Sequence, residues 1–239
     1  MTVLVVSGTG TEIGKTVVTA ALASVARAAG RSVAVLKPAQ TGVGPDERGD
    51  ADEVVRLAGD EVVPVELARF PEPLAPDTAA RRAGMAPVGP WEVADAARKL
   101  AGEHDLVLVE GAGGLLVRYD DEGGTLADAA GLLNAPVLVV APPALGTLNM
   151  VTLTAEALRA RGLVQAGVVV GAWPDEPGLA ERCNVRDLPE VAGAPLLGAV
   201  PAGAGALDPA AFRAAAGHWL APALGGTWDA EAFTAAVVR

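Results

Sequence analysis

A glycine-rich segment near the start of the chain, SGTGTEIGKT at residues 7–16, holds the residues best suited to chemistry. It follows an apolar run and ends in Gly14, Lys15 and Thr16, where a helix is predicted to begin. Glycines allow backbone N–H groups to turn toward an anion, and the positive end of the helix dipole adds to the attraction. In such a loop the lysine reaches the β- and γ-phosphates of a nucleotide, and the hydroxyl binds Mg²⁺. The segment predicts a nucleoside triphosphate site; the alternative is a tight turn between a strand and a helix.

Two further charged residues stand directly after apolar runs. Lys37 begins KPAQTG, which also contains Thr41, and Glu110 begins EGAGG. A carboxylate at the end of a buried strand is a suitable Mg²⁺ ligand, and the glycines after it let the backbone approach a bound molecule closely. We expect the strand to end at Lys37, because Pro38 has no N–H to donate. The alternatives are a solvated lysine at a strand end and an exposed glutamate in a glycine-rich loop.

A third candidate is Asp50, the first residue of DADEVVRLAG. It could cap a helix, bind Mg²⁺ or do both. Asp52 is the nearby competitor. The two carboxylates cannot both face the phosphates if a helix starts at residue 50, because positions i and i+2 lie on different faces.

Short apolar runs predict the elements that hold these residues. They begin near residues 3, 32, 105, 135, 166 and 194, and they are continuous rather than alternating, as in strands buried on both faces. Helix-length stretches at 15–30 and 147–162 end in Gly30 and Gly162, which are typical C-caps, and 70–84 reads as a loop that enters a helix. This alternation predicts one α/β domain over residues 1–239, with a mostly parallel sheet and helices on both faces. Ligands of such sheets bind outside the carboxyl ends of the strands.

The composition excludes several classes of protein. With 239 residues, 51% of them hydrophobic, the chain can form a substantial core. Its net charge of −11 argues against nucleic acid or an anionic membrane as a partner. The single Cys183 permits no disulfide within the chain, and His104 and His218 lack the neighbours of a structural zinc site. Because no run is long enough to span a bilayer and no signal peptide is evident, we expect a cytoplasmic protein.

The motifs as a set resemble the dethiobiotin synthetases, ligases that close the ureido ring in biotin synthesis. The stretches that carry the resemblance are GTGTEIGKT, KPAQTG, GDADEV, VEGAGG and LGTLN, and it extends to about LGAVPAG at 197. Each motif alone is shared with other P-loop proteins, whereas the set in this order is specific. The resemblance implies a P-loop fold, ATP, Mg²⁺ and a homodimer. It also implies a reaction of CO₂ with 7,8-diaminononanoate through a carbamate and a carbamic–phosphoric anhydride.

The resemblance further implies roles for individual residues. Lys15 and Lys37 would be catalytic, and Thr16, Asp50 and Glu110 would hold Mg²⁺. The nucleotide would contact Glu12, Ile13, Gly14, Lys15, Thr16, Val17, Asp50, Glu110, Gly111, Ala112, Gly113, Gly171, Ala172, Pro201, Ala202 and Gly203. The diamine substrate would contact Thr11, Lys37, Thr41, Gly113, Gly114, Gly146, Thr147 and Asn149, the last three receiving its carboxylate at a helix N-terminus.

Two positions raise separate questions. Glu12 is an anion in a phosphate loop; the family pattern TE-aliphatic-GKT agrees with a backbone N–H that faces phosphate and a carboxylate that turns away, with no task assigned to it. In the family an Asn-Asp pair commonly reads adenine, but this chain has Gly171 and Ala172 there. We therefore expect a base-tolerant enzyme that can use CTP, GTP or UTP in place of ATP. Trp173 is either a core residue or a stacking partner for the base.

Two other classes share the phosphate loop. Cobyrinate-type amide synthases add a glutaminase domain with a nucleophilic cysteine, for which this chain has neither the length nor a suitable residue. Partition and septum-site ATPases switch partners instead of making a small molecule. Their loop has an additional lysine where this chain has Gly10, and many end in a basic amphipathic helix, whereas the last residues here are weakly acidic. A switch ATPase of this kind is the alternative function.

Overall fold

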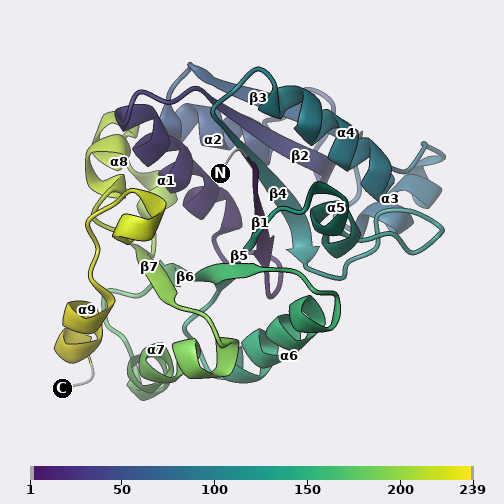
Figure 1. Cartoon of the computed structure of the whole chain (residues 1–239). Helices are drawn as coiled ribbons and strands as arrows, with labels where there is room; N and C mark the ends of the chain where they lie inside the picture. Colours follow the sequence, from purple (N-terminus) through teal and green to yellow (C-terminus); the bar gives the residue numbers. More distant parts are fainter. Residues whose placement is uncertain (1–2, 238–239) are drawn as a thin grey trace.

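The computed structural model describes residues 3–237, which form one parallel sheet with helices on both faces (Figure 1). The strand order is β3-β2-β4-β1-β5-β6-β7. The strands are β1 (Val3–Gly8), β2 (Val33–Thr41), β3 (Val62–Phe70), β4 (Leu106–Gly114), β5 (Val137–Ala141), β6 (Gln165–Trp173) and β7 (Leu196–Pro201). The chain winds from β1 to β3 and then back across the sheet, so the connections that follow the neighbouring strands β1 and β4 lie on opposite faces. The segment after the central strand β1 therefore lies at the switch point where such sheets bind ligands. The predicted α/β class with a parallel sheet is confirmed.

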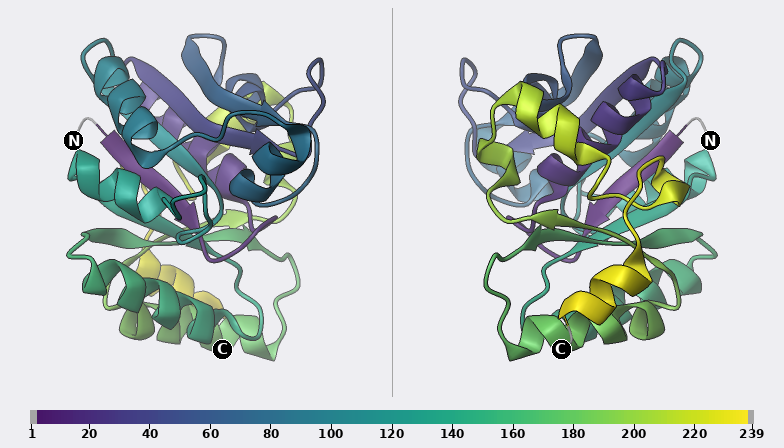
Figure 2. Two further views of the ribbon diagram at one scale, coloured as in Figure 1. Left: turned by 90° about the vertical axis from the view of Figure 1, so that its right-hand side faces the viewer. Right: turned by 90° about the vertical axis from the view of Figure 1, so that its left-hand side faces the viewer.

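The helices divide into two layers. They are α1 (Lys15–Ala28), α2 (Asp50–Ala58), α3 (Pro76–Ala83), α4 (Pro90–Ala101), α5 (Leu126–Leu133), α6 (Thr147–Ala160), α7 (Leu179–Ala192), α8 (Pro209–Ala216) and α9 (Ala230–Val237). Helices α1, α2 and α8 pack together on one face, and α4 to α7 cover the other (Figures 1 and 2). This arrangement follows from right-handed crossovers, since the chain winds in opposite directions before and after β3. Among residues 3–237, no helix is long and apolar enough to cross a bilayer.

Strand β3 was not among the predicted strands. Its sequence VVPVELARF is interrupted by Pro64, Glu66 and Arg69, and most of its residues are only partly buried. It lies at the edge of the sheet and pairs with β2 alone, which is where proline and charge are tolerated. The helix ends also differ slightly, because α1 and α6 are capped by Ala29 and Arg161, and Gly30 and Gly162 follow with positive φ.

The expectation that the second strand ends before Pro38 is wrong, and the correction explains the site. Strand β2 pairs with β4 only from Val33 to Leu36, but it pairs with β3 as far as Thr41. Pro38 lies beyond the last residue paired with β4, so its missing N–H breaks no bond to that strand. Lys37 and Glu110 are therefore inside their strands, at the point where β2 and β4 part. Each side chain can enter the gap that opens between the two strands.

Candidate active site

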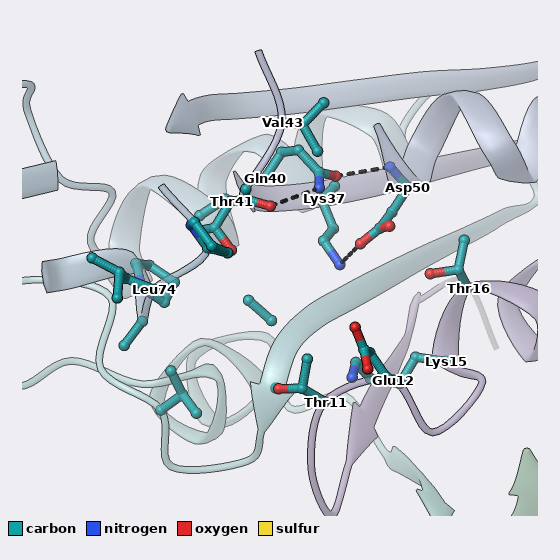
Figure 3. Close-up of a pocket in the computed structure, with 18 of the residues that line it drawn as sticks. Thr11, Glu12, Lys15, Thr16, Lys37, Gln40, Thr41, Val43, Asp50 and Leu74 are labelled. Atoms are coloured by element: carbon teal, nitrogen blue, oxygen red, sulfur yellow. Dashed lines mark hydrogen bonds and ion pairs between the residues drawn. The ribbon is translucent and has the colours of Figure 1, made fainter. Parts of the chain in front are cut away.

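The Lys37 ammonium lies at the centre of the site, where β2 and β4 part. Its Nζ lies 2.5 Å from Asp50 Oδ2, and it donates to Glu110 Oε1 at 2.9 Å and to the Gly111 carbonyl at 3.1 Å. Figure 3 shows Lys37 and Asp50 reaching toward each other from β2 and α2. Lys37 is 3% exposed and Glu110 is 1% exposed, so water screens this ion pair poorly.

The pKa of the Lys37 ammonium depends on its burial and on the two carboxylates that contact it. Burial acts to lower the pKa of the Lys37 ammonium, but the carboxylates of Glu110 and Asp50 outweigh it and raise the pKa. Lys37 is thus a cation at any physiological pH. Thr16 Oγ1 donates to the same oxygen, Glu110 Oε1, at 2.8 Å. The other oxygen, Glu110 Oε2, is buried and finds no hydrogen-bond partner among the described residues.

The three residues expected to hold Mg²⁺ meet around this ammonium. Thr16, Asp50 and Glu110 come from α1, α2 and β4, and each contacts Lys37 or a group bonded to it. Over residues 3–237, no group of three or more His, Cys, Asp and Glu side chains could hold a metal ion alone. Mg²⁺ usually takes one or two carboxylates, water and substrate phosphates. The unpaired Glu110 Oε2 and the cation that already lies between the carboxylates show that these donors fit a hard cation.

Lys15 spans the mouth of the phosphate loop. Its Nζ donates to the Gly10 carbonyl at 2.8 Å, and the side chain is buried. Burial lowers the pKa of the Lys15 ammonium, and the nearby Lys37 charge lowers it further. A bound phosphate would offer this lysine a stronger, charged acceptor than a loop carbonyl.

The backbone of the phosphate loop is held in an unusual form. Glu12 has φ 58° and Gly14 has φ 91°, both in the left-handed region, and Glu12 is one of two such non-glycine residues in the described chain. The Glu12 side chain is exposed and borders the cavity. The loop also rests on the end of β6, because a Cβ built at Gly171 would overlap the Ile13 carbonyl oxygen. Two backbones therefore meet where the family commonly has a base-reading side chain.

Helix α2 begins at Asp50, but its N-cap is Gly49 and not Asp50 as one interpretation had it. The capping carboxylate is that of Asp52, whose Oδ2 accepts the Gly49 N–H at 2.9 Å. The Asp50 N–H donates to Gln40 Oε1 at 2.8 Å, which leaves the Asp50 carboxylate free to face Lys37. The two aspartates point to different faces of the helix, as its geometry requires.

A cavity of about 710 Å³ lies over this centre. Its wall includes Thr11, Glu12, Ile13, Gly14, Lys15, Thr16, Lys37, Ala39, Gln40, Thr41, Gly42, Val43, Asp50, Pro73, Leu74, Ala75, Pro76, Ala112, Gly113 and Val117. One side is charged, and the segment at 73–76 adds an apolar side; Figure 3 shows Leu74 across the cavity from Thr16 and Asp50. The wall can thus accommodate a ligand that is polar at one end and aliphatic at the other.

Several predicted site residues lie elsewhere. Gly146, Thr147 and Asn149, at the start of α6, do not line the cavity of their own chain. Gly171 meets the phosphate loop at Ile13 and Gly14, and Ala172 follows it in β6. The Ala202 N–H donates to the Trp173 carbonyl at 2.7 Å, which brings 201–203 beside the end of this strand. The Trp173 ring packs edge-on against Phe233 with centroids 5.1 Å apart, and it lies against the hydrophobic core. The core interpretation of Trp173 is the one that these contacts favour.

Sequence reasoning missed three residues that shape the site. Gln40 is buried and bonded to Asp50, as described above. Tyr119 is buried, and its hydroxyl accepts the Ala112 N–H at 2.9 Å, which supports the glycine-rich end of β4. Arg69 on β3 bonds the loop before α2. The motif KPAQTG contained Gln40, whereas no local signal marked Tyr119 or Arg69. Tyr119 bonds a residue seven positions earlier, and Arg69 bonds residues more than twenty positions earlier.

Comparison with known proteins places this geometry in a family. A family model described as an AAA domain matches residues 2–208. The ATP-dependent dethiobiotin synthetase of Streptomyces avermitilis is 73% identical over 238 residues, which cover all of both chains. That of Saccharopolyspora erythraea is 70% identical and covers 96% of this chain and all of its own.

Solved structures agree on the fold at much lower identity. A ParA family ATPase from Chlorobium tepidum has a TM-score of 0.57 at 14% identity and covers 89% of this chain and 90% of its own. The MinD cell division protein of Aquifex aeolicus has a TM-score of 0.53 at 14% identity, covering 84% and 82%. At such identities the likeness extends to the fold alone. The sequence comparisons decide the family: this chain belongs to the ATP-dependent dethiobiotin synthetases, ligases built on the fold of the P-loop ATPases.

Proposed function

We propose that this protein uses ATP and Mg²⁺ to carboxylate 7,8-diaminononanoate with CO₂ and to close the ureido ring of dethiobiotin. The observation that carries the proposal is the buried Lys37 ammonium, which shares one cavity with the phosphate loop, Thr11 and Thr41. In P-loop hydrolases the lysine of the phosphate loop and Mg²⁺ stabilise the transferred phosphoryl group. Lys37 adds a further cation beside that loop, which suits a reaction in which another anion must lie next to the phosphates.

The proposed reaction has three steps. One amine nitrogen attacks CO₂ and loses a proton, which gives a carbamate. A carbamate oxygen then attacks the γ-phosphorus, and the bond to ADP breaks. The second amine attacks the carbonyl carbon of this mixed anhydride, a proton is lost, and phosphate leaves as the ring closes. Lys37 would stabilise the negative charge of the carbamate and of the transferred phosphoryl group, and Lys15 would stabilise the β- and γ-phosphates.

Mg²⁺ would be held by Thr16, Asp50 and Glu110, and it would supply positive charge to the phosphates. Entry of the metal would compete with Lys37 for the same two carboxylates, and it would free the ammonium to bind substrate. The aliphatic chain of the diamine would lie against Val43, Leu74 and Val117, apolar residues of the cavity wall.

The first prediction concerns the reaction itself. Phosphate release from Mg-ATP should require both diaminononanoate and bicarbonate. Lys15→Ala or Lys37→Ala should lower the rate of release about 100-fold or more, because each variant loses a cation that stabilises negative charge in the transition state. Lys99→Ala, at an exposed position on α4, is the control and should behave as wild type. Release that ignores the diamine would instead support a switch ATPase.

Stability should separate the two lysine variants. Loss of Lys37 leaves the Glu110 carboxylate buried without its cation, which is strongly unfavourable. Lys37→Ala should therefore unfold at a lower temperature than Lys15→Ala in a thermal scan.

The second prediction separates Asp50 from Asp52. Asp50→Asn should raise the Mg²⁺ concentration that gives half-maximal turnover by about 10-fold or more, because a ligand carboxylate is lost. Asp52→Asn keeps an oxygen that can cap α2 and should stay within about twofold of wild type. A magnesium titration of both variants checks this, and the opposite ranking would transfer the metal role to Asp52.

The third prediction concerns the nucleotide base. Side chains that could read adenine are absent at Gly171 and Ala172, and the contact between Gly171 and Ile13 explains why one cannot be added at 171 without moving the phosphate loop. Turnover with ATP, CTP, GTP and UTP should differ by less than about 1,000-fold, because recognition by shape alone discriminates weakly. Steady-state rates with all four measure this. A larger preference for ATP would reveal an adenine-reading group elsewhere.

Gly171→Asn tests the structural cause. It should lower the unfolding temperature and activity together without creating selectivity for ATP, because its Cβ overlaps the Ile13 oxygen. Gly217→Ala, where nothing lies within 4 Å of the added Cβ, is the control.

The fourth prediction concerns assembly, for which we propose a homodimer. Leu145, Met150 and Leu153 at the start of α6 are exposed by 90%, 43% and 52%, and such apolar surface marks a contact site. A second copy seated there could bring the amides at the N-terminus of α6 to the cavity of its partner. Leu153→Glu should therefore give a monomer of 23.9 kDa and a raised KM for the diamine.

Sedimentation at several concentrations measures the mass of this variant. The control is Trp91→Glu, at an exposed position on α4, which should leave both the mass and the KM unchanged. A wild-type protein that sediments as a monomer would contradict the proposed dimer.

A further inference from the structure

Arg69, on the edge strand β3, holds the loop that joins β2 to α2 (residues 42–49). Its Nη1 donates to the Gly44 carbonyl at 3.1 Å and also to the Glu47 carbonyl. The loop is exposed over most of its length, and it bears few other bonds to the rest of the fold. Gly42 is fastened at its start by an N–H donated to the Phe70 carbonyl at 3.0 Å. Arg69 therefore fixes the middle of a segment that is otherwise open to solvent.

The same guanidinium is itself oriented by carboxylates. Glu66 receives two parallel bonds from it, both at 2.9 Å, which is the forked geometry that arginine can form and lysine cannot. Asp52 Oδ2 lies 3.6 Å from Nη2, and this oxygen also accepts the Gly49 N–H. One side chain thus joins β3, the loop and the first turn of α2.

The last residue of the loop, Gly49, packs closely against this cluster. A Cβ built at Gly49 would overlap Glu66 Oε1 and would lie 3.0 Å from both Arg69 Nη2 and Gln40 Oε1. Gly49 has φ −92° and ψ −179°, an extended conformation that any residue adopts, so an added Cβ would cause no backbone strain but would displace the Glu66 carboxylate from its place beside Arg69. Close packing at Gly49 therefore restricts the position of the next residue, Asp50, which begins α2.

Asp50 connects the cluster to the site. Its N–H is held by Gln40, and its carboxylate contacts the Lys37 ammonium directly (Figure 3). The position of that carboxylate thus depends on where the loop ends. The Arg69 side chain bonds the loop carbonyls and Glu66 and makes no hydrogen bond or ion pair with Lys15, Thr16 or Lys37, so the loop that ends at Asp50 is its direct link to the site.

We propose that Arg69 is a positioning residue for Asp50, which sets the affinity of the site for Mg²⁺ by fixing the loop at 42–49. The proposal rests on the metal role of Asp50 proposed above. Residues that orient a metal ligand typically change metal affinity by about 10- to 100-fold when they are altered. The expected signature is a shift in the magnesium requirement with little change in the rate at saturating magnesium.

The test uses two pairs of variants. Arg69→Lys keeps the charge but loses the fork, and Arg56→Lys is its control, because Arg56 likewise bonds a carboxylate three residues away, Glu53, and a distant carbonyl, Gly205. Gly49→Ala introduces the overlap with Glu66 without changing charge. Gly44→Ala is its control in the same loop, since its Cβ would come no closer than 3.4 Å to Glu47 Oε2.

Two measurements are made on each full-length variant. The first is the Mg²⁺ concentration for half-maximal turnover at saturating nucleotide, together with kcat at saturating Mg²⁺. The second is amide hydrogen exchange over residues 44–50 in metal-free protein, which does not depend on activity. Arg69→Lys and Gly49→Ala should raise the magnesium requirement about 10-fold, with kcat within about twofold, and Arg69→Lys should speed exchange in the loop. Both controls should match wild type.

Each contrary result has a distinct meaning. Faster loop exchange in Arg69→Lys with an unchanged magnesium curve would overturn the proposal, because the loop would then be fastened without effect on the site. Equal shifts in the two control variants would overturn it as well, since the effect would not be specific to Arg69. An Asp50→Asn variant with the wild-type magnesium requirement would instead overturn the metal role of Asp50. The two failures are distinguishable because each is measured on a different variant.

Discussion

The burial of one ammonium between two carboxylates is the constraint on which the site depends. Moving an isolated ion out of water costs several kcal/mol, and the cost is offset only when opposite charges and hydrogen bonds surround it. Lys37 meets this condition through Glu110, Asp50 and the Gly111 carbonyl. Lys37 and Glu110 are the two deeply buried charges, and neither would be stable at this depth without the other. Asp50, whose side chain is 38% exposed at the start of α2, adds a second carboxylate to this pair.

Charge balance in this cluster supports the Mg²⁺ that we propose to bind together with the nucleotide. Two carboxylates, Asp50 and Glu110, face two ammonium groups, Lys15 and Lys37, so two negative charges against two positive ones leave no net charge. A triphosphate entering a neutral centre would meet the carboxylates as well as the lysines. A divalent cation that takes over the carboxylates would leave both lysines available to anions. The same residues can thus be a stable ion-pair network before binding and a strongly positive site after it.

Much of this could be predicted from the sequence, and the remainder has identifiable causes. The central strands were evident because continuous apolar runs are buried on both faces, and the phosphate loop was evident because Gly14, Lys15 and Thr16 are adjacent in the chain. The edge strand β3 was missed because partial burial permits Pro64 and Arg69 within it. The positions of Lys37 and Glu110 inside their strands were missed too. The sequence does not reveal that β2 stops pairing with β4 after Leu36 and continues to pair with β3. Tyr119 and Gln40 act through hydrogen bonds to backbone groups seven and ten residues away, and such bonds leave no periodic pattern in the sequence.

Fold and chemistry separate clearly in this protein. Its solved neighbours among the ParA and MinD ATPases share the sheet and its helices at 14% identity, so the fold alone would equally have suggested a switch ATPase. The residues to which we assign the chemistry stand where strands end or part, and there a few side chains can change without disturbing the core. Lys37 is such a residue, because its side chain requires only the gap between β2 and β4 and the two carboxylates that pair with its charge.

Where the phosphate loop meets the end of β6, the contacts are made by backbone atoms and not by side chains. Gly14 and Gly171 let the phosphate loop lie directly on the end of β6, with no room for a side chain between them. This contact lies beside the left-handed turn at Glu12 and Gly14, and turns with such backbone angles can present successive amides to an anion, as we propose for phosphate. A side chain at 171 that could read a base would displace the loop that binds the phosphates. Tight seating of the loop and a base-reading side chain at that position are therefore mutually exclusive, and in this chain the loop occupies the space.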